Sequence, residues 1–174
     1  MRITVYRDLP FAIFRYDPAD EWLVRREAGL LATRLDGAGK RVTTVSMADL
    51  MWEAIDRTEG LEAIVELEQI RGFDAAQEQV TTYLSDEDWM PLPRLLTERL
   101  GTLDARRDIA FLTRAAAMAP SIYHMSKLLD EMQGRTDVPT ILFYPGTLEG
   151  TTGLRFMGLK ERDALGNYRV KIYA

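Results

Sequence analysis

Cysteine is absent from this chain of 174 residues, and histidine occurs once, as His124. Without a thiol the chain has no cysteine nucleophile, zinc ribbon or iron–sulfur site, and no disulfide framework of the kind found in small secreted proteins. A single imidazole excludes a metal site built from several histidines and leaves one candidate imidazole base. The sequence therefore predicts neither a bound metal nor thiol chemistry.

Long apolar runs are also missing, because none approaches the roughly 20 residues that a membrane-spanning helix needs. The opening residues, MRITVYRDLP, have no apolar core of the kind that signal peptides contain. We therefore expect a soluble intracellular protein that does not cross a membrane.

Motifs for nucleotide cofactors are lacking as well. No G-x-G-x-x-G follows a candidate strand, so a dinucleotide cofactor has no support. The stretch 37–40 reads GAGK, but Arg41 stands where a P-loop has a hydroxyl, and the stretch leaves a helix instead of entering one. A helix C-cap followed by a turn explains these residues, and we predict no cofactor.

Charge is unevenly distributed along the chain, whose formal net charge is -5. Residues 61–104 hold ten acidic and three basic side chains, a balance of -7, whereas residues 105–174 hold seven acidic and ten basic ones, a balance of +3. This pattern disfavours a nucleic-acid-binding stripe across the whole molecule and permits a docking face for a partner. Ordinary solvated helix faces would also explain it.

Four short apolar runs at 11–14, 42–45, 109–113 and 141–144 have the composition of buried strands. Helical patterns separate them, and about 47–104 forms a helical insertion between the second and third runs. This order predicts an α/β fold with a mostly parallel central sheet flanked by helices on both faces.

The end of the chain carries two further runs, 154–157 and 168–173, after Pro145-Gly146, a pair typical of a tight turn. The short connections predict a C-terminal antiparallel meander, in which Tyr144, Phe156 and either Tyr168 or Val170 pack together. Since no linker, repeat or low-complexity tract interrupts the chain, we expect residues 1–174 to form a single domain.

Three basic residues, Arg155, Arg169 and Lys171, are the candidate binding residues of this terminal region. Alternation along a strand places Arg169 and Lys171 on one face, where they could hold an acidic partner segment or a phosphate backbone. Protection of a sheet edge by charge is the alternative. His124, early in the helix after the third strand, is either a base at the ligand-binding edge or a helix-start residue. No catalytic constellation is predicted.

Motifs spread over nearly the whole chain resemble the BrxB family of the BREX (bacteriophage exclusion) systems. The most specific part is a Tyr-Pro-Gly turn followed by a Phe-x-Gly strand and a Tyr-Arg strand. The residues that carry the resemblance are Phe11, Ile13, Phe14, Tyr16, Asp17, Pro18, Glu21, Val24, Arg25, 142–146, 154–158 and 168–170.

The resemblance implies a cytoplasmic bacterial component of an antiphage defence operon, working beside a DNA methyltransferase, a large ATPase and PglZ, a protein with an alkaline-phosphatase-like domain. BrxB-like proteins resemble degenerate nucleotide-fold domains, which implies a non-catalytic scaffold role with PglZ or another BREX protein as the contact. Association with DNA through the complex and homo-oligomer formation stay open. The alternative is a nucleic-acid-binding module that uses the basic C-terminal face.

Overall fold

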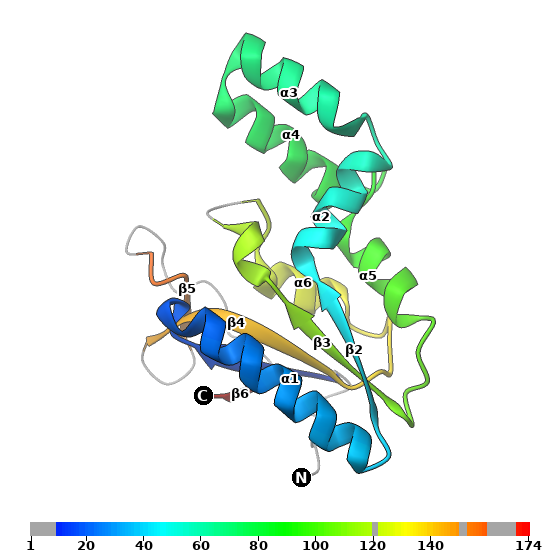
Figure 1. Cartoon of the computed structure of the whole chain (residues 1–174). Helices are drawn as coiled ribbons and strands as arrows, with labels where there is room; N and C mark the ends of the chain where they lie inside the picture. The colour runs from blue at the N-terminus through cyan, green and yellow to red at the C-terminus, as the bar shows by residue number, and fades with distance from the viewer. Residues whose placement is uncertain (1–9, 120–121, 150–152, 160–169) are drawn as a thin grey trace.

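A computed structural model describes residues 10–119, 122–149, 153–159 and 170–174 of the chain. Their strands form a six-stranded sheet in the order β2-β3-β4-β1-β6, with β5 paired to β4 (Figure 1). The strands are β1 (Phe11–Tyr16), β2 (Arg41–Ser46), β3 (Asp108–Thr113), β4 (Thr140–Glu149), β5 (Gly153–Phe156) and β6 (Lys171–Tyr173). All pairings are parallel except that between β4 and β5. The predicted α/β fold with a mostly parallel sheet is confirmed.

Helices separate the strands in the predicted order, and in the described part of the chain none has the length and apolarity needed to cross a bilayer. Between β2 and β3 lies the helical insertion. The helical elements are η1 (Pro18–Asp20), α1 (Glu21–Gly37), α2 (Met47–Asp56), α3 (Gly60–Arg71), α4 (Phe73–Ser85), α5 (Leu92–Leu100), η2 (Ala115–Met118) and α6 (Met125–Glu131).

Local chemistry explains where several helices begin and end. The Asp17 side chain accepts a hydrogen bond from Ala19 N at 2.9 Å, and Pro18 opens η1, where a missing N–H costs nothing. The Ser46 hydroxyl caps α2 by accepting from Asp49 N at 3.1 Å. At its C-terminus α1 ends at Gly37, and Gly39 takes a left-handed φ of +80° in the turn that follows.

The two faces of the sheet bury different cores. On β3, Ile109 and Phe111 belong to a small cluster covered by α1, whereas Ala110 and Leu112 belong to a large cluster on the other side. The large cluster draws its side chains from α2, α4, α5 and α6. In contrast, α1 has no fully buried residue. One sheet face is therefore deeply covered and the other is covered by a single described helix.

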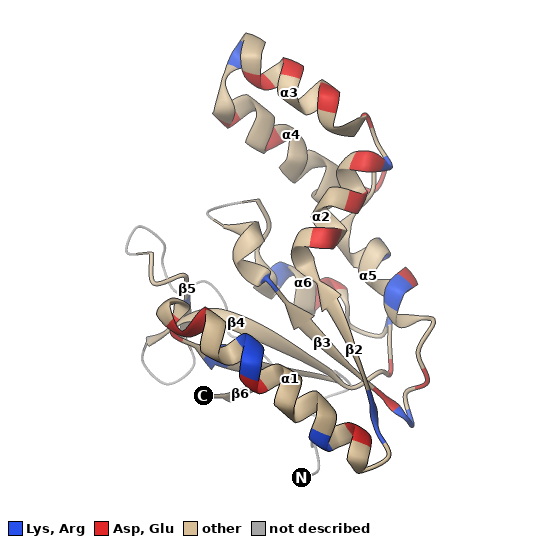
Figure 2. Ribbon diagram, viewed as in Figure 1, with Lys and Arg blue, Asp and Glu red and all other residues tan. Residues whose placement is uncertain are grey.

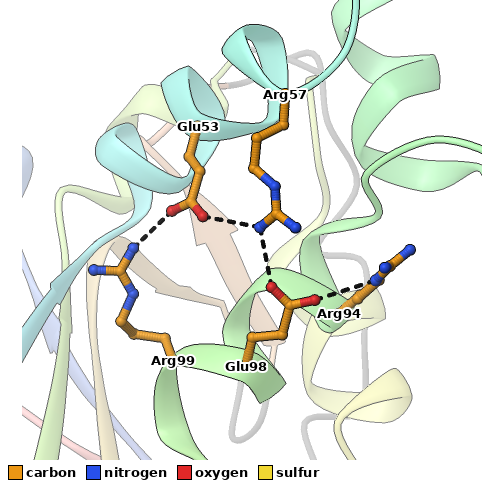
Figure 3. Close-up of polar contacts among 5 residues, drawn as sticks. All are labelled: Glu53, Arg57, Arg94, Glu98 and Arg99. Atoms are coloured by element: carbon orange, nitrogen blue, oxygen red, sulfur yellow. Dashed lines mark hydrogen bonds and ion pairs between the residues drawn. The ribbon is translucent and has the colours of Figure 1, made fainter. Parts of the chain in front are cut away.

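The helical insertion extends away from the sheet, with α3 and α4 forming a projecting hairpin (Figure 1, top). At the base of the insertion, a network of exposed ion pairs joins α5 to α2 (Figure 3). Arg57 bridges Glu53 and Glu98 at 3.0 Å each, Arg99 contacts Glu53 at 2.6 Å, and Arg94 contacts Glu98 at 3.2 Å. The Arg57 hydrogen bond is the largest cause of a lowered Glu98 pKa.

The C-terminal region corrects two expectations. β4 does not stop at a turn but runs through Pro145 and Gly146 to Glu149 before the chain returns as β5. Pro145 fits within the strand because β3 pairs with β4 only as far as Leu142, so no N–H is required on that side. The antiparallel pairing of β4 with β5 is the only described part of the predicted meander.

β6 does not pair with β5 but lies parallel to β1, with Ala12 opposite Lys171. β5 is antiparallel to β4, whereas β4, β1 and β6 are parallel, so β5 and β6 run in opposite directions as expected but are not neighbours in the sheet. The short-connection argument constrains strand direction and not which strand becomes the neighbour. The predicted contact of Tyr144 with Phe156 is confirmed, with ring centroids 5.3 Å apart. Tyr168 and Arg169 lie outside the described residues.

Candidate functional site

A cleft of about 380 Å³ opens at the carboxyl ends of β1 and β3 and where the pairing of β4 with β1 ends, at Pro145. In parallel α/β sheets this edge is where ligands bind, because the loops that leave the strands converge there. Its walls are formed by Pro18, Glu21, Arg25, Arg114, Ala116, Ala117, Pro145 and Met157. Charged and apolar side chains thus meet in one hollow.

A second hollow of about 280 Å³ lies between α1 and the β2–β3 side of the sheet. It shares Arg25 and Arg114 with the cleft, and Thr44, Phe111 and Thr113 are among its other walls. The two hollows therefore meet at the two arginines. α1 is the only helix of the described residues that covers this face, and the hollow lies beside it.

The arginines are held by acidic neighbours. Glu21 accepts from Arg25 Nε at 2.7 Å through one carboxylate oxygen and from the Tyr16 hydroxyl through the other. Burial, followed by the Glu21 hydrogen bond, raises the pKa of Tyr16, which keeps that hydroxyl a donor. Arg114 Nη1 lies 3.4 Å from Asp49 Oδ1. Both arginine side chains stay roughly half exposed toward the cleft region.

Backbone geometry marks the same cleft. Among the described residues, only Arg114 (φ 57°) and Met157 (φ 55°) are non-glycine residues in the left-handed region, and both line it. Such conformations cost free energy and persist where the surrounding structure imposes them, which occurs often at binding sites. The loop after β3 and the turn after β5 thus both shape the wall of the cleft.

Neither Arg155 nor Lys171, two of the three basic residues predicted from sequence, is among the described residues that line this cleft. Arg155 lies on β5 opposite Thr147, whereas Lys171 lies on β6 opposite Ala12, with Lys171 Nζ 5.0 Å from the Tyr173 ring centroid. Ala12 pairs with Ile141 of β4, and Arg155 pairs with Thr147 of the same strand. These two positions on β4 are six residues apart, which is about 20 Å along the strand. Arg155 and Lys171 are therefore not brought together, and Arg169 is outside the described residues.

The structure also places the other residues that the sequence analysis considered as possible site residues. His124 is the exposed N-cap residue of α6. The turn after α1 places Lys40 Nζ 2.7 Å from the Arg106 carbonyl oxygen, so the GAGK stretch is a C-terminal turn and not a phosphate loop. Within the described ranges no three potential metal ligands cluster.

Sequence reasoning missed Arg25 and Arg114 as site residues. A signal was present, because Arg114 directly follows the third predicted strand and Arg25 lies one turn into the helix after the first. Both positions are at the carboxyl edge of a parallel sheet, where ligand-binding side chains are expected. That the two strands lie on either side of β4 was not evident until the strand order was known.

Comparisons with known proteins agree with the resemblance. The family model described as BREX protein BrxB matches residues 43–172, about three quarters of the chain. A BREX protein BrxB from Bacillus cereus (strain H3081.97) is 26% identical over 158 residues, which cover 88% of this chain and 79% of that protein. No solved structure matches the chain. With the family match covering most of its length, this chain belongs to the BrxB family of BREX proteins.

Proposed function

We propose that this chain is a non-catalytic adaptor of a BREX antiphage defence system. It works in the bacterial cytoplasm and binds PglZ or another BREX component. Family membership supports a role beside other BREX proteins. The observation that carries the adaptor role is an exposed apolar surface on the outside of α1.

This α1 surface consists of Trp22, Leu23 and Leu30, which are 78%, 48% and 47% exposed. At 100° per residue they lie on the side of the helix opposite Val24 and Ala28, which pack on the sheet. A helix that is apolar on two sides is normally covered on both. Exposed aromatic and leucine side chains gathered on one face mark a protein-binding surface, and tryptophan is a frequent energetic centre of such contacts.

A second exposed surface lies on the projecting α3–α4 hairpin, whose exposed apolar residues are Leu61, Val65, Ile70 and Phe73. Residues 60–85 contain five acidic side chains and one basic side chain, a balance of -4. Figure 2 shows these acidic positions along both helices. Because the hairpin and α1 are separate parts of the fold, two partners could be contacted at once, as an adaptor requires.

The non-catalytic part of the proposal is supported by the sequence, which has no thiol and a single histidine, at a helix start. The basic residues Arg155, Arg169 and Lys171 are proposed as contacts for an acidic segment of a partner. Nucleic-acid binding through them stays a prediction, and it requires binding that weakens steeply with salt.

Co-purification with PglZ and the other proteins of the same operon tests the proposal. We expect a complex with the unchanged chain and at least about tenfold weaker association for Trp22→Ser, since buried tryptophans often contribute 2 kcal/mol or more to an interface. Trp52→Ser is the matched control, because Trp52 is also exposed but lies on α2. The proposal fails if no BREX protein associates at low or moderate salt.

A further inference from the structure

We propose that the cleft at the carboxyl ends of β1 and β3 binds a small phosphorylated molecule, held by Arg25 and Arg114. This site goes beyond the adaptor role and does not depend on it. The volume of about 380 Å³ falls in the range of small-ligand pockets. The second hollow adjoins it at the same two arginines and adds the hydroxyl-bearing residues Thr44 and Thr113.

The donor geometry of the two arginines argues for a phosphate. The guanidinium group has a planar fork of donors that matches phosphate oxygens, and it stays charged at every physiological pH. Two such groups line the cleft, where Arg25 is paired with Glu21 and Arg114 with Asp49, so a phosphate would be recognised through the donors that these ion pairs leave over. Glu21 also lines it, but its carboxylate already accepts hydrogen bonds from Arg25 and Tyr16.

The arginines are positioned and still have donors to offer. Glu21 accepts a hydrogen bond from Arg25 Nε, and Arg25 Cζ lies 4.9 Å from the centroid of the Trp22 ring. The two Nη groups of Arg25 make no hydrogen bond to the described residues. Toward the described residues, the Arg114 side chain makes one contact, from Nη1 to Asp49 Oδ1 at 3.4 Å. This arrangement fixes each guanidinium by one edge and leaves the other edge available, as phosphate recognition needs.

The remaining walls suggest what the phosphate is attached to. Pro18, Ala116, Ala117, Pro145 and Met157 are the apolar residues of the cleft. They suit a ligand with an apolar or flat body beside its phosphate, such as a nucleotide. The left-handed conformations of Arg114 and Met157 shape two of these walls, consistent with a binding role for the strain.

Isothermal titration with AMP, adenosine and inorganic phosphate tests this site. We expect saturable binding of AMP, weaker binding of inorganic phosphate and the weakest response with adenosine. Arg25→Gln and Arg114→Gln should each lower AMP affinity by at least about tenfold, because each removes a charged hydrogen-bonding partner. Arg34→Gln, also exposed on α1 but outside the cleft, is the control and should bind as the unchanged chain does.

Two results would overturn the site. One is the absence of saturable binding of both AMP and inorganic phosphate up to about 10 mM, a concentration at which even weak specific sites fill. The other is AMP binding that neither arginine variant alters. Circular dichroism and the unfolding midpoint of each variant show that it has folded, so a lost signal reports the site. Co-purification with BREX proteins is scored separately, so failure here leaves the adaptor role standing.

Discussion

Asp108 is the clearest case of a single residue that tertiary structure makes important. It is 2% exposed at the start of β3, yet it keeps a negative charge. Arg41, its direct partner on β2, donates to both carboxylate oxygens at 2.6 and 2.8 Å, and Asp104 N donates at 2.8 Å. A buried carboxylate is tolerated only with such compensation.

The Arg41 hydrogen bond, followed by that of Asp104 N, lowers the pKa of Asp108 in the folded chain. The unfolded chain therefore binds a proton first as the pH falls, and the carboxylate stabilises the fold fully only above the unfolded value of about 3.9. We expect Asp108→Asn to unfold at lower urea concentration than the unchanged chain at pH 7. This difference should shrink as the pH falls through and below about 4.

Urea unfolding at several pH values between about 3 and 7 measures this effect. Arg41→Met, which removes the main cause of the pKa shift, should also reduce the loss of stability on acidification. A stability difference between Asp108→Asn and the unchanged chain that is the same at every pH would show that Asp108 is not ionised in the way described.

Among the elements, the β4–β5 hairpin depends on a close approach of its two strands at Gly146. A Cβ atom placed on Gly146 would lie 2.3 Å from the Arg155 carbonyl oxygen and 2.8 Å from Tyr144 Cε1. The returning strand thus lies directly over a position that only glycine can occupy. Arg15 Nη1, 3.4 Å from the Gly146 carbonyl oxygen, contacts the same point from β1.

Gly146→Ala should destabilise the chain by about 3 kcal/mol, because the clash is with backbone, which cannot move aside cheaply. The matched control is Gly29→Ala, in α1, where an added methyl meets nothing within 4 Å. That change should stabilise the chain by about 0.5 to 1 kcal/mol through helix propensity. Equal midpoints of chemical unfolding for the two variants would contradict the described hairpin.

Across the whole molecule, the two faces of the sheet are covered by helices to different extents. One sheet face packs against most of the helical insertion and α6, the other against α1, and the α3–α4 hairpin projects from the body (Figure 1). Within α3 only Ile64 is buried. A unit with few buried apolar contacts opens more easily than a central strand.

Hydrogen exchange followed by mass spectrometry should therefore find residues 60–71 exchanging at least about tenfold faster than 140–145, since the hairpin can open without unfolding the sheet. Residues 47–56, in α2, provide the internal comparison, because this helix buries five residues against the core and should exchange slowly. Uniform protection across all three segments would mean that the hairpin is part of one cooperative unit with the sheet.

Much of this architecture is a direct consequence of local sequence. The apolar runs at 11–14, 42–45, 109–113 and 141–144 became parallel strands because their composition favours burial and helical segments separate them. Asp17 and Ser46 begin helical turns because their side-chain oxygens accept hydrogen bonds from the first backbone N–H groups. The BrxB family was also identified from local sequence motifs, which extend over most of the chain.

Only the tertiary structure decided how distant segments meet. The pairing of β6 with β1, the continuation of β4 through Pro145-Gly146 and the convergence of Arg25 with Arg114 each join residues far apart along the chain. Local patterning determines whether a segment is a strand, but the strand order depends on which pairing buries the most apolar surface. For that reason the cleft, which exists only in the assembled sheet, was absent from the sequence-based prediction.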